Sequence, residues 1–390
     1  MTPTDPPEPL WGPETERARA VLSFSGRTLG SFPSLVRALG SVKVAAAKAN
    51  ASAGTLDPAA ATAVETAARR LRDGQLNEHL VVDPLGGGGG IGVHQNVNEV
   101  LATIAGCGPA EVGASQSTAD VCHTAARLAV LDDADKLDAA VVALVAELTA
   151  TAGRFDGVET LARTCLQDGL AVPARLLFDG AAAAAERRRT RLCSALESLN
   201  QVVLGATVIG TGTGAAPAYR AAVVGVLSVV TGRPLTAHAQ PASALQYGDD
   251  LADVSGSLVG LAAVLAKLAQ DLRLLSSGPA GGFGELRLPK VMDGSSFFID
   301  KNNPVVPETM IQAALAVNGL DATVRAAAGR AELHLHGYDL TAAVALMDAL
   351  AMLTRAVNLL RLHALAELTL DEDRCAQLAE FATAHKEMHQ

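Results

Sequence analysis

The chain has few aromatic side chains. Only 3% of its 390 residues are Phe, Trp or Tyr, although 49% are hydrophobic, and alanine and leucine are prominent among these. Strands of an extensive sheet favour aromatic and β-branched residues, whereas alanine and leucine favour helices. We therefore predict an all-α protein in which helices pack on helices.

Paired cysteines are absent as well. The five cysteines, at positions 107, 122, 165, 193 and 375, are odd in number, irregularly spaced and nowhere arranged as CxxC. This pattern argues against a disulfide framework and against a cysteine-ligated zinc site, and it indicates a reducing compartment.

Basic blocks, an export signal and long uncharged apolar runs are also missing. The formal net charge is -10, which gives no electrostatic footprint for nucleic acid. The first residues, MTPTDPPEPLW, contain prolines and acids where a signal peptide needs a basic start and an apolar run. No uncharged apolar stretch reaches the length that spans a bilayer. We expect a cytoplasmic protein with no nucleic-acid partner and no membrane partner.

Apolar residues recur at three- and four-residue spacing over much of the chain, which predicts amphipathic helices. Alanine-rich faces let such helices approach closely, as in a bundle. The predicted helices cover residues 34–53, 58–71, 96–105, long stretches within 131–277, about 308–318 and 339–366.

One segment carries a specific motif. The stretch GSSFFIDKNNPVVPE, residues 294–308, contains all six fixed positions of the pattern GSSxxxxKxNP. Further stretches follow one another in a matching order: VKVAAAKANASAGTLD, HQNVNEV, GASQSTADV, ARTCLQDGLAVP, VIGTGTG and SSGPAGGFGELRLP. Together they resemble the aspartase/fumarase superfamily over about residues 11–380, and the VVPE ending looks nearer to aspartases than to fumarases.

The resemblance implies a fold and an assembly. It divides the chain into an N-terminal helical domain (1–125), a central helix-bundle domain (126–365) and a short remnant of a C-terminal domain (366–390). The central domain carries the serine loop, which is the motif segment 294–308. The resemblance also implies a homotetramer in which each active site combines segments of three subunits. Here those segments are residues 89–98 with 115–120, residues 163–168 and residues 294–308.

The reaction that the resemblance implies is an anti β-elimination. A base removes a proton next to a carboxylate, an aci-carboxylate dianion forms, and the group on the neighbouring carbon leaves. Because that proton is weakly acidic, the site needs an activated base and fixed positive or donor groups. By similarity Ser295 is the base as its alkoxide. By the same similarity Lys301 and Asn303 hold the carboxylate and the dianion, and Ser296 donates to the substrate.

A second segment departs from the family pattern. In fumarases a histidine pairs with the glutamate that corresponds to Glu308, and here Cys165 replaces it, while Thr164 and Gln167 remain as substrate-binding candidates. Losing this proton donor argues against a hydratase, because an amine that is already protonated leaves with less help than hydroxide. Cys165 is either a buried apolar filler or a catalytic thiol, and Glu308 is either a substrate ligand or a helix-start acid.

The glycine-rich segment departs further. Where the family has hydrogen-bond donors, this chain has Gly89, Ile91, Val93 and Ala119. The substrate-binding candidates that remain are His94, Asn96, Ser117 and Thr118, and His94 is equally a ligand or a helix-start partner. We expect an apolar wall, with Ile91 and Ala119 in contact with the substrate, that makes plain aspartate or fumarate a poor ligand.

Metal and cofactor signals are weak. His334 and His336 have a metal-like spacing for a strand, but no third ligand is evident, so we expect no metal and no cofactor.

Three functions remain open. The first is a carbon–nitrogen lyase that acts on a small amino or carboxylic acid resembling aspartate or succinate. The second is a catalytically silent tetramer that binds a ligand or partner, and the third is a cycloisomerase-like variant that also works through an enolate. Retention of Ser295, Lys301 and Asn303 together favours the enzyme.

Overall fold

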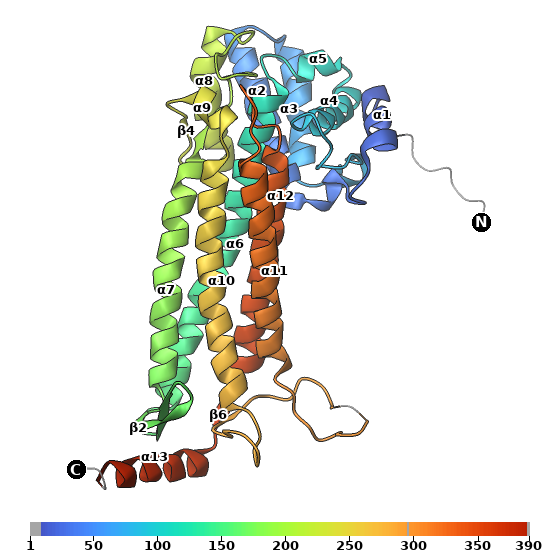
Figure 1. Ribbon diagram of the computed structural model, residues 1–390. Coiled ribbons are helices and arrows are strands. Elements are labelled where there is room, and N and C mark those ends of the chain that lie inside the picture. The colour runs from blue at the N-terminus through green and yellow to red at the C-terminus, as the bar shows by residue number, and fades with distance from the viewer. Residues whose placement is uncertain (1–8, 295, 388–390) are drawn as a thin grey trace. The chain divides into compact units, whose positions relative to one another are not determined.

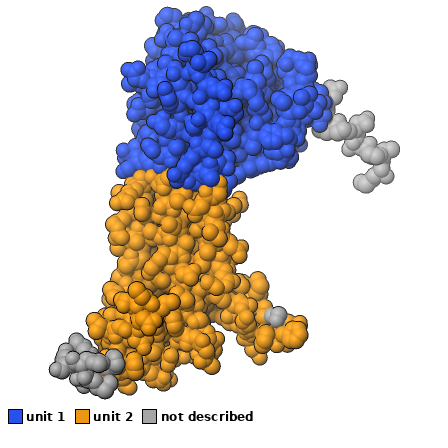
Figure 2. Space-filling model, in the orientation of Figure 1, with its two compact units in different colours: residues 1–133, 194–255, 320–348 blue, residues 134–193, 256–319, 349–390 orange. Residues whose placement is uncertain are grey.

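The computed structural model describes residues 9–294 and 296–387, and the chain divides into two compact units (Figures 1 and 2). Helices dominate the described residues of both units, and the strands are short, which confirms the all-α prediction. The units group segments that are distant in sequence, and the division into three contiguous domains stays a prediction. Unit 1 comprises residues 1–133, 194–255 and 320–348, and unit 2 comprises 134–193, 256–319 and 349–390.

Unit 1 is built around a buried helix. After α1 (Pro13–Leu22), the helix α2 (Pro33–Ala53) buries 15 of its 21 residues and packs on α3 (Pro58–Arg72). A Cβ at Gly40 would lie 2.5 Å from the backbone nitrogen of Arg72, so only glycine permits this close approach. Both predicted helices are confirmed to within one residue.

The glycine run leads into α4 (Ile91–Ala105), which begins five residues earlier than predicted. Gly90 has a φ of +92°, and a Cβ on it would lie 2.8 Å from Sγ of Cys122. Glycine therefore lets the start of α4 pack on α6 (Thr118–Arg154), with the short α5 (Pro109–Val112) between them in sequence. The earlier start places His94 inside the helix.

Several further elements complete unit 1. They are α8 (Pro217–Thr231), α9 (Pro241–Gln246), parts of α10 (Asp249–Leu275), α11 (Val305–Ala328) and α12 (Asp339–Leu360), the parallel pair β3 (Gln201–Val202) and β4 (Thr236–Ala237), and 3₁₀ turns at Leu29–Ser31, Asn77–His79 and Ser198–Asn200.

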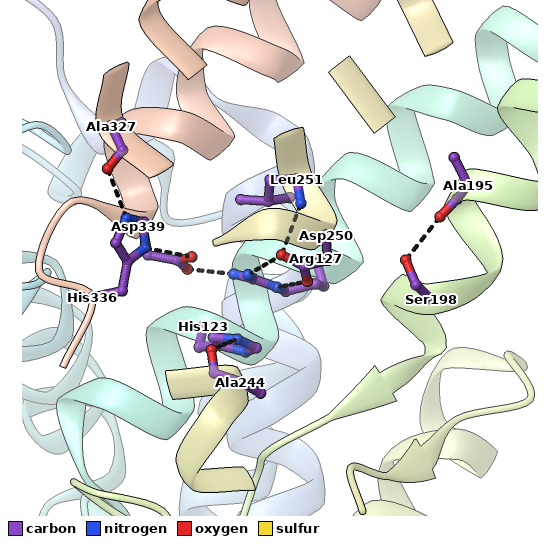
Figure 3. Close-up of polar contacts among 10 residues, drawn as sticks. All are labelled: His123, Arg127, Ala195, Ser198, Ala244, Asp250, Leu251, Ala327, His336 and Asp339. Atoms are coloured by element: carbon purple, nitrogen blue, oxygen red, sulfur yellow. Dashed lines mark hydrogen bonds and ion pairs between the residues drawn. The ribbon is translucent and has the colours of Figure 1, made fainter. Parts of the chain in front are cut away.

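A buried charge network joins helices of unit 1 (Figure 3). Arg127 of α6 is fully buried and donates two hydrogen bonds to Asp250 and one to Asp339. Burial raises the pKa of Asp339, but the charge of Arg127 outweighs it and holds that pKa well below its ordinary value. His123 donates from Nε2 to the Ala244 carbonyl, and burial together with Arg127 lowers its pKa to about 4, so it is neutral.

His336 closes the network. Its Nε2 lies 2.9 Å from the Ala327 carbonyl oxygen and its Nδ1 lies 3.4 Å from Asp339. Both partners are acceptors, so the imidazolium form with two N–H donors fits this geometry. Burial lowers the pKa of His336, but these two hydrogen bonds outweigh it and raise the pKa overall.

His336 should make stability depend on pH. A raised folded pKa gives a contribution that is complete below the unfolded value of about 6.5 and is lost as pH rises through the folded value. We expect His336→Gln to lower the urea midpoint, followed by circular dichroism, more at pH 6 than at pH 9. His334→Gln, at an exposed position, is the matched control. An equal loss for His336→Gln at both pH values would contradict the imidazolium assignment.

Unit 2 is a bundle of long helices (Figure 1). It contains the remaining parts of α6, α10, α11 and α12, most of α7 (Leu176–Glu197), a π-helical turn at Arg361–Leu365 and α13 (Glu372–Glu387). Arg189 of α7 donates two hydrogen bonds to Asp138 of α6, at 2.6 and 3.1 Å. Gly260 of α10 faces Arg188 of α7, whose guanidinium would lie 2.8 Å from a Cβ there. The predicted bundle is confirmed.

A hairpin between α6 and α7 was not predicted. β1 (Glu159–Thr164) pairs antiparallel with β2 (Gln167–Pro173), and the register shifts between Leu161 and Arg163. This irregularity interrupts the alternation that reveals a strand in a sequence. A second antiparallel pair, β5 (Leu286–Arg287) and β6 (Thr369–Leu370), is too short to be recognised from sequence.

Two helical stretches, residues 249–275 and 339–365, are long and apolar enough to cross a membrane by length and composition. In the second, 67% of the apolar window is buried inside the protein, as in a core helix. That no membrane partner exists stays a prediction.

Candidate active site

Two of the predicted segments meet in unit 1 through His94 and Thr118. His94 lies in the first turn of α4 and Thr118 is the first residue of α6, with Nδ1 and Oγ1 3.0 Å apart. Nε2 of His94 lies 2.9 Å from Nζ of Lys43 on α2, and Lys43 is fully buried. The amino ends of two helices thus meet beside a buried lysine, an arrangement that attracts negative charge.

The electrostatics of this cluster follow from its burial. Burial lowers the pKa of Lys43 to about 7, although Cys122 and Asp120 oppose the shift. Burial and the charge of Lys43 hold the pKa of His94 well below its ordinary value, so the imidazole is neutral.

Ser117 caps helix α6. Its hydroxyl accepts from the backbone N–H of Asp120, and its own N–H donates to that carboxylate at 2.9 Å. The other carboxylate oxygen accepts from the N–H groups of Gly205 and Thr207. Asp120 therefore anchors a loop, and the predicted substrate contact of Ser117 competes with a structural role.

Asn96 requires a correction. It is fully buried, its Oδ1 accepts from the N–H of Val81 at 2.9 Å, and its Nδ2 donates to the His79 carbonyl at 3.0 Å. The prediction that Asn96 binds substrate is wrong, because its amide holds the preceding loop.

The predicted apolar wall also requires a correction. Ala119 is 7% exposed and packs with Val203 and Leu245 in the core, and Val93 is 1% exposed. Neither can form the wall of a substrate pocket. Ile91 is 50% exposed and stays a candidate.

Residues 164–167 form the turn of the hairpin in unit 2. Cys165 and Leu166 have φ values of +53° and +60°, as a two-residue hairpin turn requires at its two central positions. Thr164, Cys165 and Gln167 are all exposed. Cys165 as a buried filler is therefore wrong, and a role in substrate binding stays a prediction.

A buried ion pair fixes the base of this turn. Arg163 donates from Nη1 to Glu285 at 2.6 Å, and the Thr160 hydroxyl donates to the other carboxylate oxygen. The guanidinium of Arg163 also lies 4.4 Å from the centre of the Phe283 ring. The exposed turn residues thus extend from a firmly held base.

Ser295, the predicted base, lies outside the described residues. Around it the loop folds back, since the N–H of Lys301 donates to the Phe298 carbonyl at 3.1 Å. A Cβ on Gly294 would lie 2.0 Å from that same carbonyl oxygen, so only glycine fits. Ser296 is exposed.

Lys301, Asn303 and Glu308 line one cleft of about 740 Å³ in unit 2. Arg273 lines the same cleft and donates from Nε to Glu308 at 3.1 Å. Arg287 also lines the cleft but pairs with Asp371, so Lys301 is the cation of this lining for which the described residues record no carboxylate partner. Its charge is the one that favours a carboxylate of a ligand.

Within residues 9–294 and 296–387, no group of three or more His, Cys, Asp or Glu side chains could hold a metal ion. His336 belongs to the charge network, and His334 is exposed. That the chain needs no metal and no cofactor stays a prediction.

Two residues of these clusters escaped the sequence analysis. Lys43 is the only charge in the apolar run SVKVAAA, which is a usable signal for a buried lysine. Arg273, in QDLRLLSS, carries no signal that distinguishes it from other helix-surface arginines.

The helix bundle, the GSSxxxxKxNP motif and the cleft lined by Lys301 and Asn303 fit the class of lyases of the fumarase type, and comparison with known proteins agrees. The family model described as Lyase matches residues 1–319. Aspartate ammonia-lyase of Pseudomonas canavaninivorans is 36% identical over 96% of this chain and 82% of its own length. Class II fumarate hydratase of Mycobacterium tuberculosis is 33% identical, over 96% of this chain and 80% of its own length.

Solved structures agree with the sequence relatives. A crystal structure described as fumarate lyase:delta crystallin from Brucella melitensis has a TM-score of 0.92 and 33% identity, and the match covers 99% of this chain and 91% of that one. The chain therefore belongs to the lyase family, within the aspartase/fumarase superfamily. It is a lyase, and its likeness to the ammonia-lyases supports a carbon–nitrogen lyase.

Proposed function

We propose that the chain catalyses an anti β-elimination that cleaves a carbon–nitrogen bond, or the reverse addition, on an aspartate- or succinate-like substrate. Ser295, as its alkoxide, removes the proton next to a carboxylate and becomes a neutral hydroxyl. Lys301 and Asn303 hold that carboxylate and the dianion that develops on it, so their interactions strengthen as the charge grows. The amine leaves already protonated.

The observation that carries this proposal is the cleft that Lys301 and Asn303, two residues of the motif segment 294–308, line together with Arg273. The charge of Lys301 suits a substrate that gains negative charge during the reaction. Glu308 is already bound by Arg273, and Cys165 replaces the family histidine, so a donor for a leaving hydroxide is lacking from this pair. An ammonium group needs no such donor, which favours deamination over dehydration.

Replacing Lys301 tests the proposal. We expect Lys301→Met to lower kcat/KM by about 10²–10³-fold, because one preorganised charge that faces the dianion is lost. Turnover is followed by ultraviolet absorbance of the α,β-unsaturated product. Lys267→Met, at an exposed helix position with the same charge change, should keep the wild-type rate. Equal rates for wild type and Lys301→Met would contradict the assigned role.

We also propose a homotetramer whose active sites each take segments of three subunits. The resemblance supports it, and so do large apolar side chains exposed on helices, among them Val142, Val229 and Leu315 at 46%, 84% and 66%. Each unit of the chain carries only part of the predicted site.

Mixing two impaired variants tests the shared site. We expect Thr118→Val to keep about a tenth of wild-type activity and Lys301→Met about a hundredth or less. Tetramers reassembled from equal amounts should recover about a quarter of wild-type activity, since each site draws the two segments from different subunits at random. Mixtures no more active than the separate variants, at a tetrameric mass by light scattering, would show that both residues serve a site within one subunit.

A further inference from the structure

Lys43 and His94 belong to a row of hydrogen bonds that ends at Thr118, a predicted substrate-binding residue. This hydrogen-bonded row runs from Gln116 through Lys43 and His94 to Thr118, with successive distances of 2.8, 2.9 and 3.0 Å. Both ring nitrogens of His94 are occupied by these contacts. His94 therefore acts on a ligand only through Thr118.

The donor and acceptor of the Gln116–Lys43 hydrogen bond, at the start of this row, are fixed. The amide nitrogen of Gln116 donates to two backbone carbonyls, at 2.9 and 3.1 Å, so its oxygen faces Lys43 and accepts. A charged amine has only protons to offer, so Lys43 also donates to Nε2 of His94. A neutral imidazole that accepts at Nε2 carries its proton on Nδ1 and donates it to Thr118.

At the other end of the row, the Thr118 hydroxyl keeps its own proton free to donate. A threonine hydroxyl that accepts a hydrogen bond keeps its own proton for another acceptor. In the part of the chain that the structure describes, His94 is the recorded partner of the Thr118 hydroxyl. Thr118 is only partly buried, so a bound ligand can supply the missing acceptor.

We propose that Lys43 and His94 are positioning residues that fix the Thr118 hydroxyl as an outward donor, and that the subsite beside Thr118 takes an acceptor oxygen of a carboxylate, amide or carbonyl. This inference rests on the proposed function and deepens it. A donor with a buried positive charge behind it compensates for those missing from the glycine-rich segment.

Which groups donate in this row of hydrogen bonds depends on whether Lys43 is protonated, and burial lowers the pKa of Lys43 to about 7. Asp120, which also bears on Lys43, accepts from three backbone N–H groups, and this fits its ionised form although burial raises its pKa. Burial raises the pKa of Cys122 to about 12, so that thiol is neutral. A neutral Lys43 keeps two N–H groups and gains a lone pair, so it no longer forces Nε2 of His94 to accept. Where Lys43 accepts from Nε2 instead, the Thr118 hydroxyl donates to Nδ1 and no longer offers its proton to a ligand.

The tautomer of His94 tests this row of hydrogen bonds without any ligand. Nitrogen NMR of the full protein with ¹⁵N-labelled histidine, with the His94 signal assigned by its loss in His94→Asn, should show the proton on Nδ1 at pH 6 and a growing share of the Nε2 tautomer towards pH 9. A proton on Nε2 at pH 6, or an imidazolium, would overturn the proposal.

Binding of two unreactive probes tests the outward donor. By calorimetry, wild-type affinity for succinate should fall from pH 6 to pH 9 by up to about tenfold, the size of one hydrogen bond to a charged group. Butyrate, which lacks the second carboxylate, should show no such fall. Thr118→Val should lose the same affinity at pH 6, and Thr118→Ser should retain it.

His94→Asn separates positioning from fold. Its amide nitrogen can still donate to Thr118 but cannot reach Lys43, so succinate should bind equally at both pH values. An unchanged pH dependence in this variant, or wild-type affinity in Thr118→Val, would overturn the proposal. A wild type that binds neither probe and turns over no amino acid would count against the proposed function instead. The tautomer of His94 would still test the hydrogen bonds from Lys43 to Thr118.

Discussion

Replacing Ser295 by alanine should lower kcat by about 10²–10⁴-fold, the usual contribution of a positioned general base. The proton beside the carboxylate is weakly acidic, so its removal should depend on the activated base. Binding of a substrate analogue should stay near the wild-type level, because Lys301 and Asn303 remain in place.

The control for Ser295→Ala is Ser52→Ala. The Ser52 hydroxyl is exposed on α2 and donates only to the Lys48 carbonyl, so its loss should leave turnover unchanged. A Ser295→Ala enzyme that keeps more than about a tenth of the wild-type rate would move the role of base to another residue.

Replacing Arg127 by methionine should destabilise unit 1 by about 3–5 kcal/mol, because two carboxylates would stay buried without their partner. Arg127 is fully buried, and every hydrogen bond recorded for its guanidinium goes to Asp250 or Asp339. Urea denaturation followed by circular dichroism measures the loss. Arg175→Met, which removes an exposed arginine that also binds two aspartates, should leave the midpoint unchanged.

A triple variant separates lost charge pairing from lost packing. Adding Asp250→Asn and Asp339→Asn to Arg127→Met removes the uncompensated charges and should restore part of the stability. A triple variant less stable than Arg127→Met alone would show that packing, and not charge, dominates at this position.

Part of the fold followed directly from the sequence. α2 and α3 were predicted to within one residue because apolar residues follow helical spacing along both segments. The position of the serine loop followed from its fixed glycine, lysine, asparagine and proline. The hairpin at residues 159–173 was missed because a register shift hides its alternation.

Side-chain direction was the part that sequence could not give. Asn96 and Ala119 face the core. His94 and Thr118, from the same two segments, instead meet at the starts of their helices. The helix start at Ile91, five residues earlier than predicted, decides these directions, and a run of five glycines gives no boundary signal. Lys43 comes from a distant helix, so its contact with His94 required tertiary structure.

The central claim is tested most directly by incubating the purified protein with aspartate and a panel of its amides, esters and substituted derivatives. Absorbance of the unsaturated product and released ammonia should rise together, in equal amounts, for at least one member that carries an acceptor oxygen at the second position. Ser295→Ala should abolish both signals. Binding of these compounds without any product or ammonia would contradict a carbon–nitrogen lyase and identify a silent ligand-binding relative.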